Sequence, residues 1–412
     1  MRMFRVWCST KSVGNYIVEN TSLRAKDVQL SKLSVSDSNS PKEFHAIPDH
    51  IKKILYLDAP DVIVERDKEP IFSVEISTEA GTGHNVFQRF ARLAASVENN
   101  VPTFYIYPEA VYITRRNTAD PRNPICRWDA INPNVFTVLE KVMQIYGIPA
   151  LFFYHPSEYT RGTCGKPRNT ITKGVKFDRR HRGCPDSSDA EMRALFDILD
   201  IVIERSERGT RRPELINERP VSDRRMWMQS EFTKHGGKDG AGSPYSATKI
   251  VRTESLIQHL KGFVGRSYRF GELLASREMT VVYHPDAKYR GDPYPGTLAA
   301  VDYLLCRTGK TFEDRDKNLV LAWGVVDERD NNLEVTPTSS VEDFLGQIRN
   351  VRENRGRCLL DREYGGLKNE QIPRYYMQTR YGCSYTKSKD IRCYAYFADA
   401  ILFGDGALWR DG

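Results

Sequence analysis

Hydrophobic and polar positions alternate with two different periods along the first 155 residues. Residues 61–65 and 71–77 are short β-prone runs separated by the charged turn "RDKEP", which favours two paired antiparallel strands. Residues 85–100 repeat apolar side chains at helical spacing, which predicts an amphipathic helix. Further runs predict strands at 54–58, 103–108 and 148–156 and helices at 41–55 and 135–147. Together these elements predict an α/β fold with a mixed β-sheet flanked by helices.

Beyond residue 156 the periodicity of apolar and polar positions becomes less regular. A basic loop at 161–187 is followed by a helix over 189–205 and by a polar stretch, 206–250, that is typical of a flexible linker. From residue 251 onward, predicted helices and strands alternate again, and residues 340–354 are among the predicted helices. The sequence therefore predicts a core at 1–160, a basic loop, helix and linker at 161–250, and an α+β accessory or recognition domain at 251–412.

Composition narrows the class of protein. The 412 residues are 40% hydrophobic and 28% charged, as in soluble globular proteins. No apolar run approaches the roughly 18 residues needed to cross a bilayer, and the first residues lack a signal-peptide pattern, so we expect a cytoplasmic protein without a membrane partner. Eight cysteines occur without a CxxC pair, which favours free thiols. Cys164, Cys184 and His181 offer zinc ligands but lack a fourth.

Positive charge is concentrated in one segment. The chain has a formal net charge of +7, and residues 161–182 contain eight Lys or Arg against the single acid Asp178. Interleaved Gly, Thr and Asn favour a phosphate-binding arm, although a solvated loop would have the same composition. The candidate DNA-binding residues are Arg161, Lys166, Arg168, Lys173, Lys176, Arg179, Arg180 and Arg182.

Two acids belong to the predicted strand pair at 61–77. Asp61 opens the first strand and Glu75 lies near the end of the second, so antiparallel pairing brings both to one end of the sheet. Paired carboxylates bind Mg²⁺, which prefers hard oxygen ligands, and the main-chain carbonyl of Ile76 is a candidate third ligand. A surface hairpin with ordinary acids is the alternative interpretation.

Pro60 and Asp61, the spacing to Glu75 and the order of elements through Tyr154 resemble the PD-(D/E)XK nuclease superfamily, which includes most type II restriction endonucleases. The resemblance covers residues 40–155. It implies a lysine two residues after Glu75, where this chain has Ser77. Ser77, His84 and Gln88 are therefore added to the candidate catalytic residues, with Arg89 as a residue that steers phosphate.

The resemblance implies an endonuclease that cuts double-stranded DNA with Mg²⁺, for which Mn²⁺ would substitute. Cutting both strands of a symmetric site is simplest for a homodimer. Two alternatives remain. One is a catalytically inactive nucleic-acid-binding protein, with Ser77 as the trace of lost activity, and the other is a nuclease for RNA or modified DNA.

Overall fold

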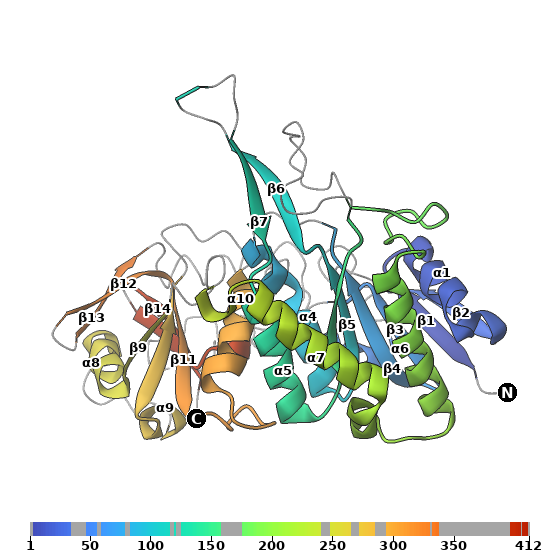
Figure 1. Ribbon diagram of the computed structural model, residues 1–412. Coiled ribbons are helices and arrows are strands. Elements are labelled where there is room, and N and C mark those ends of the chain that lie inside the picture. Colours follow the sequence, from blue (N-terminus) through green and yellow to red (C-terminus); the bar gives the residue numbers. More distant parts are fainter. Residues whose placement is uncertain are drawn as a thin grey trace, which may run out of the picture. The chain divides into compact units, whose positions relative to one another are not determined.

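The computed structural model describes residues 3–33, 47–55, 59–78, 83–115, 119–120, 125–157, 175–239, 248–264, 272–284, 294–329, 332–337, 396–404 and 406–410. The chain forms two compact units (Figure 1). The first contains residues 1–35 and 45–243, and the second contains residues 36–44 and 244–412. The predicted α/β class is confirmed, because each unit contains a mixed sheet flanked by helices.

A six-stranded sheet forms the core of the first unit. Its spatial order is β2 (Val28–Lys32), β1 (Phe4–Cys8), β3 (Val62–Arg66), β4 (Glu69–Ile76), β5 (Thr103–Tyr107) and β8 (Ala150–Tyr154). Only β3 runs antiparallel to its neighbours, so the other five strands end at the same edge of the sheet. We call this the C-terminal edge. Ligands of such sheets bind where the parallel strands end.

Helices between the strands make the parallel connections. The 3₁₀-helix η2 (Gly83–Arg89) leads into α4 (Phe90–Glu98), which joins β4 to β5, and α5 (Asn134–Tyr146) precedes β8. Ser73 of β4 donates a hydrogen bond to Ser96 of α4, so α4 covers the sheet face that carries Ser73 and Glu75. Gly147 ends α5 in the left-handed conformation, with φ of 70°, as the sequence predicts for a C-cap glycine.

The remaining elements of the first unit are α1 (Lys11–Asn20), η1 (Ser22–Ala25), α3 (Asp49–Lys52), β6 (Ala110–Arg115), β7 (Ile125–Ala130), α6 (Ala190–Glu207), η3 (Arg212–Asn217), α7 (Arg219–Lys234) and η4 (Gly237–Asp239). Tyr16 of α1 packs against Phe196 of α6, and α6 also contacts β4 and β8. No helix of the described part of the chain is long and apolar enough to span a membrane.

Several local predictions were wrong. Residues 54–55 lie in a turn instead of a strand, residues 56–58 are outside the described part, and only residues 49–52 of the expected helix at 41–55 are shown to be helical. The strand beside β3 is β1, from the start of the chain, and not the predicted strand at 54–58. Residues 219–234, predicted as linker, form α7. Its Arg224 bonds to Glu191 at 2.6 Å and stacks on Trp227, which holds this polar helix in place.

The second unit contains a sheet of the order β15 (Gly406–Trp409), β14 (Ala400–Phe403), β11 (Lys317–Ala322), β10 (Met279–Tyr283) and β9 (Thr248–Arg252). Its other elements are α8 (Thr253–Val264), α9 (Glu272–Ser276), α10 (Tyr294–Val301), the π-helix η6 (Asp302–Cys306) and the hairpin β12 (Gly324–Arg329) and β13 (Asn332–Pro337). Arg315 pairs with Asp302 and Asp399 in its interior. The helix predicted at residues 340–354 lies outside the described residues.

Candidate functional site

The register of the strands places the two candidate acids side by side. Val62 pairs with Val74, so Asp61 and Glu75 occupy the next positions along β3 and β4 and share one face of the sheet. Glu75 pairs in turn with Tyr105 of β5. This row lies at the C-terminal edge, because β4 ends one residue after Glu75. The hairpin predicted from the sequence therefore brings the two carboxyl groups together as expected.

Asp61 is held by its neighbours on both sides. Its Oδ1 accepts a hydrogen bond from the Ser9 hydroxyl at 3.1 Å, and its Oδ2 accepts one from the Ile76 backbone N–H at 2.9 Å. The backbone of Ser9 also donates to the Asp61 carbonyl at 2.8 Å. Asp61 is half-buried, and each carboxylate oxygen has a second lone pair. The side chain is thus oriented before any ligand binds.

Glu75 is the least satisfied acid of this site. Its side chain is 1% exposed, and its Oε1 lies 2.7 Å from Nη1 of Arg92 and 3.5 Å from Nε of Arg89. The other oxygen, Oε2, is buried without a hydrogen-bond partner in the described structure. Burial raises the pKa of Glu75 to about 8, and Asp61 adds to this shift, although Arg92 and Arg89 oppose it.

These carboxyl groups fit the magnesium ion that the resemblance implies. A buried oxygen without a donor, beside a second oriented carboxyl, is an arrangement that a cation would complete. The expected third ligand, the carbonyl of Ile76, belongs to a residue whose N–H already donates to Asp61. The structure thus brings Asp61, Glu75 and Ile76 together at one point of the edge.

The structure describes the other predicted catalytic residues to different extents. Ser77 follows β4, is 7% exposed and donates its backbone N–H to the carbonyl of Ile106. His84 and Gln88 belong to η2, where Gln88 is half-buried and the His84 side chain is outside the described part. Arg89, the residue expected to steer phosphate, lies 3.5 Å from Glu75, and Arg92, which bonds to Glu75, was missed. Their spacing of three residues on a helix that follows the hairpin was the available signal.

Four of the eight predicted DNA-binding residues are described. Lys176, Arg179, Arg180 and Arg182 are exposed, whereas Arg161, Lys166, Arg168 and Lys173 lie outside the described residues. The Ser12 hydroxyl at the start of α1 donates to the carbonyl of Arg182 at 3.0 Å. Asp178 accepts hydrogen bonds from the backbone of Arg180 and from Ser187, which folds the segment back on itself.

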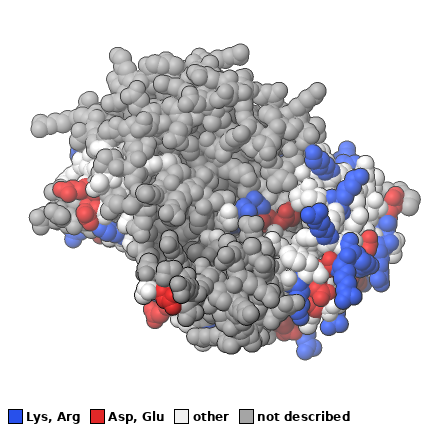
Figure 2. All heavy atoms as spheres, turned by 90° about the horizontal axis from the view of Figure 1, so that it is seen from above, with Lys and Arg blue, Asp and Glu red and all other residues white. Residues whose placement is uncertain are grey.

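This basic segment lies near Asp61. Ser9 bonds to Asp61, and Ser12, three residues further along the chain, bonds to the carbonyl of Arg182. Lys and Arg side chains gather at the right of Figure 2, on the side where α1 and β2 lie in Figure 1.

A second acidic group lies at the same edge. Glu109, Glu231 and His235 bring three potential metal-ligand atoms within 4.8 Å of one another, and within the described ranges they are the only such group of three. Lys234 Nζ already lies 2.9 Å from both carboxylates, and the Tyr154 hydroxyl is 2.7 Å from Glu231. Because an ammonium group occupies this position, the group is complete without a metal ion.

No protein-family model, no curated protein and no solved structure matches this chain.

Proposed function

We propose that the first unit is a Mg²⁺-dependent endonuclease that hydrolyses phosphodiester bonds of double-stranded DNA. The observation that carries the proposal is the buried, unpartnered Oε2 of Glu75 beside the oriented carboxyl of Asp61. Their place at the C-terminal edge and the nearby exposed basic segment support it. The hairpin of β3 and β4, followed by α4 and the parallel strand β5, keeps part of the order on which the nuclease resemblance rests, although the strand beside β3 is β1 and not residues 54–58.

Asp61 and Glu75 would hold the metal ion, with the Ile76 carbonyl as the proposed third ligand. A bound Mg²⁺ supplies a Lewis acid that activates water and neutralises charge on the phosphate. The chain itself supplies orientation, because Ser9 and the Ile76 N–H fix the Asp61 carboxyl. Lys176 and Arg179 to Arg182 would hold the DNA backbone from the adjacent surface.

Arginines of α4 and η2 can supply the positive charge that the expected lysine would carry and that Ser77 does not. Arg92 is buried and bonded to Glu75, whereas the Arg89 side chain is 26% exposed and lies 3.5 Å from the same oxygen. Arg89 is therefore the cation placed to contact a phosphate next to the metal ion. We expect Arg89→Ala to slow cleavage about 100-fold, as for loss of one transition-state donor, while Arg89→Lys retains most activity.

A metal ion must displace the proton that Glu75 binds. Because the pKa of Glu75 is raised to about 8, most of these carboxyl groups are protonated at pH 6 without metal. Cleavage at limiting Mg²⁺ should therefore rise with pH, about tenfold per unit, and level off near the pKa. A rate independent of pH between 6 and 8 would contradict ligation by Glu75.

The test of the proposed function is cleavage of supercoiled plasmid and linear duplex DNA by purified full-length protein. We expect nicked and linear products with Mg²⁺ or Mn²⁺ and none with Ca²⁺ or EDTA. Discrete fragments would indicate sequence specificity, and parallel reactions on RNA and on methylated DNA test the other nuclease hypotheses. Sizing of the protein with a symmetric duplex tests the proposed homodimer.

The alternative is a nucleic-acid-binding protein without catalytic activity. One observation favours it: the 2.7 Å contact between Arg92 and Glu75 already places a cation at one oxygen of the acid. Duplex binding that persists in EDTA, with no cleavage in any divalent metal ion, would support this alternative and reject the nuclease.

A further inference from the structure

One cavity of the first unit lies far from the candidate site. It has a volume of about 820 Å³ and is lined by the β3–β4 turn, the end of α4 and the chain from the end of α6 into η3. Glu69 lines it, whereas Glu75 lies six residues further along β4 at the other edge, about 20 Å away at the usual rise of a strand. Its size is that of a small-molecule site.

The lining is cationic around an apolar patch. Pro70, Ile71 and Pro213 contribute the apolar surface. The acids of the lining are Asp67, Glu69 and Glu207, half as many as its cations. Those cations are Lys53, Arg66, Arg205, Arg208, Arg211 and Arg212. The excess positive charge favours an anionic ligand.

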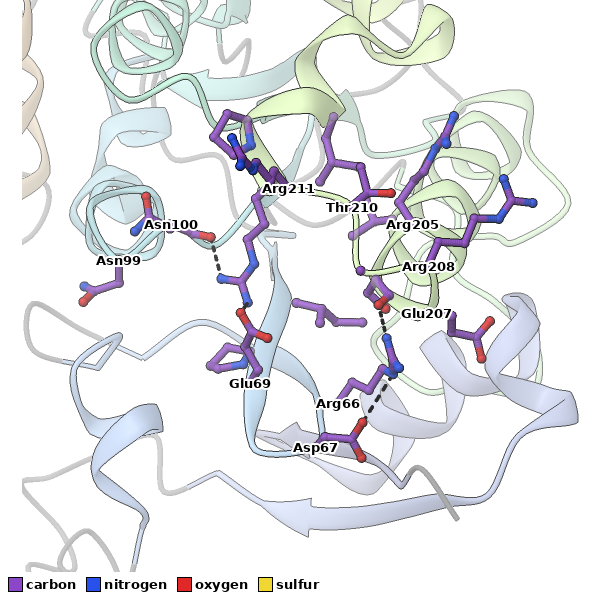
Figure 3. A pocket seen from close by; sticks show the side chains of 18 of the residues that line it. Arg66, Asp67, Glu69, Asn99, Asn100, Arg205, Glu207, Arg208, Thr210 and Arg211 are labelled. Atoms are coloured by element: carbon purple, nitrogen blue, oxygen red, sulfur yellow. Dashed lines mark hydrogen bonds and ion pairs between the residues drawn. The ribbon is translucent and has the colours of Figure 1, made fainter.

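Arg66 is the buried cation of this cavity. Arg66 is 8% exposed. Its Nη1 donates a hydrogen bond to the carbonyl of Ser206, whereas its Nε is buried without a hydrogen bond. The nearest acid is Asp67, whose Oδ2 lies 3.6 Å from Nε, longer than a charge-assisted hydrogen bond. Figure 3 shows Arg66 beside Asp67 at the lower wall of the cavity, with Thr210 and Arg211 across from it.

Four of these six cations already contact acids or backbone carbonyls of the protein. Arg66 and Arg212 donate to the backbone carbonyls of Ser206 and Asn100, at the ends of α6 and α4, where cations stabilise the helix dipole. Arg212 also pairs with Glu69 at 2.6 Å. Arg205 and Arg208 pair with Glu218 and Glu204, and Figure 3 shows their side chains turned outward.

Two cations are available for a ligand in addition to the unpaired Nε of Arg66. No ion pair links Arg211 or Lys53 to another described residue, and both are exposed at the cavity. Burial lowers the pKa of Arg212, although Glu69 opposes the shift, so an added anion would stabilise this guanidinium as well. A phosphate would therefore gain donors from a buried wall and from the exposed side chain of Arg211.

We propose that this cavity binds an organic phosphate of nucleotide size. Phosphate groups would contact Arg66, Arg211 and the Thr210 hydroxyl, while a planar ring packs against Pro70, Ile71 and Pro213. A bare phosphate would leave the apolar patch uncovered, which is why the mixed lining favours a nucleotide over an inorganic anion. The site is separate from the proposed metal centre, and its occupancy does not depend on nuclease activity.

The probes are ADP, tripolyphosphate and adenosine, measured by calorimetry and by thermal shift with the full chain. We expect saturable ADP binding that raises the melting temperature, weaker binding of tripolyphosphate, and the weakest binding of adenosine. Arg211→Ala and Arg66→Lys should each weaken ADP binding at least tenfold, the effect of losing one charge-assisted hydrogen bond.

Arg219→Ala is the matched control, because Arg219 is 92% exposed, lies at the start of α7 and does not line the cavity. It should bind ADP as the parent protein does.

Arg211→Ala should fold normally, because this exposed side chain has no ion pair to lose among the described residues. The proposal fails if ADP shows no saturable binding up to about 10 mM, because a weaker Kd corresponds to less than about 3 kcal/mol of binding free energy. It also fails if Arg211→Ala and Arg66→Lys bind ADP like the parent, or if Arg211→Ala weakens only duplex DNA binding.

Discussion

Glu75 and Glu231 are both buried acids at the same edge of one sheet, yet their environments drive their protonation in opposite directions. Their side chains are 1% and 9% exposed. Burial raises the pKa of Glu75 to about 8. Burial would also raise the pKa of Glu231, but hydrogen bonds from His235, Tyr154 and Lys234 outweigh it and lower the value to about 2.

The difference lies in how many donors each carboxyl receives. Lys234, Tyr154 and His235 surround Glu231, so its charge is neutralised within the fold. Glu75 receives Arg92 and the more distant Arg89 on one oxygen and nothing on the other. A fully partnered carboxyl stabilises a structure, whereas one left incomplete is typical of a functional site.

Loss of either proposed metal ligand should have the largest effect. We expect Asp61→Asn and Glu75→Gln each to slow single-turnover DNA cleavage in Mg²⁺ by about a thousandfold or more, the scale of a main transition-state stabiliser. Both changes preserve side-chain shape, and duplex binding in Ca²⁺ should persist because the basic segment is unchanged.

Glu231→Gln is the control for that experiment, since it removes a carboxylate from the other acidic group at this edge. It should cleave within a few-fold of the parent protein. If Glu231→Gln abolished cleavage while Glu75→Gln did not, the metal site would have to be reassigned to Glu109, Glu231 and His235.

The two acids should also differ in how they affect stability with pH. Because the folded pKa of Glu75 is about 8 and its ordinary value is 4.5, the folded protein keeps a proton that the unfolded chain loses between these values. Stability without metal should therefore fall as pH rises through this window, with a contribution from Glu75 of about 1.4 kcal/mol per unit. Denaturant unfolding should show a weaker fall for Glu75→Gln, and added Mg²⁺ should stabilise the parent protein most near pH 8. An identical pH dependence in both proteins would mean that Glu75 does not bind this proton.

Glu231→Gln should instead destabilise the protein at neutral pH. The lowered pKa means that the folded state favours the charged form, so this stabilisation is present above the ordinary value of 4.5 and is lost as pH falls toward 2. Removing the charge at pH 7 should decrease the free energy of unfolding by about 1–3 kcal/mol, the scale of a buried charged hydrogen bond. The measurement is urea unfolding at pH 7 and pH 3, where the difference between variant and parent should be smaller.

The basic segment should contribute to affinity more than to chemistry. Replacing Arg179, Arg180 and Arg182 with Ala should weaken binding to all duplexes alike and reduce the slope of log K against log salt by about two to three. Arg219→Ala at the exposed start of α7 serves as the control. An unchanged slope in the triple variant would show that this surface does not contact DNA.

Ser77→Ala should have the smallest effect. Ser77 contributes one neutral hydroxyl, whereas the positive charge beside Glu75 comes from Arg89 and Arg92. Loss of one such hydrogen bond amounts to about 0.5–1.5 kcal/mol, or roughly tenfold in rate at most. A loss comparable with that of Asp61→Asn would assign the serine a direct catalytic role.

Much of the first unit could be predicted from the order of residues alone. The hairpin of β3 and β4, the helix α4, and the β5, α5 and β8 elements follow from local periodicity, because each buries one apolar face. Residues 54–55 of the strand expected at 54–58 form a buried turn, because an apolar run of that length does not distinguish a strand from a turn. The strand β1 was missed because its pairing with β3 joins residues almost 60 positions apart.

The sequence by itself determined that Asp61 and Glu75 share a face, because a short hairpin with alternating side chains leaves little choice of register. Only the tertiary structure decided the orientation of the Asp61 carboxyl and the protonation of Glu75. Ser9, which directly follows β1, donates a hydrogen bond to Asp61, and Arg92 of α4 donates one to Glu75. The burial that raises the pKa of Glu75 likewise comes from packing of separate elements. Local periodicity places a carboxyl on a strand, but its pKa depends on solvent exclusion and on donors that distant segments bring to it.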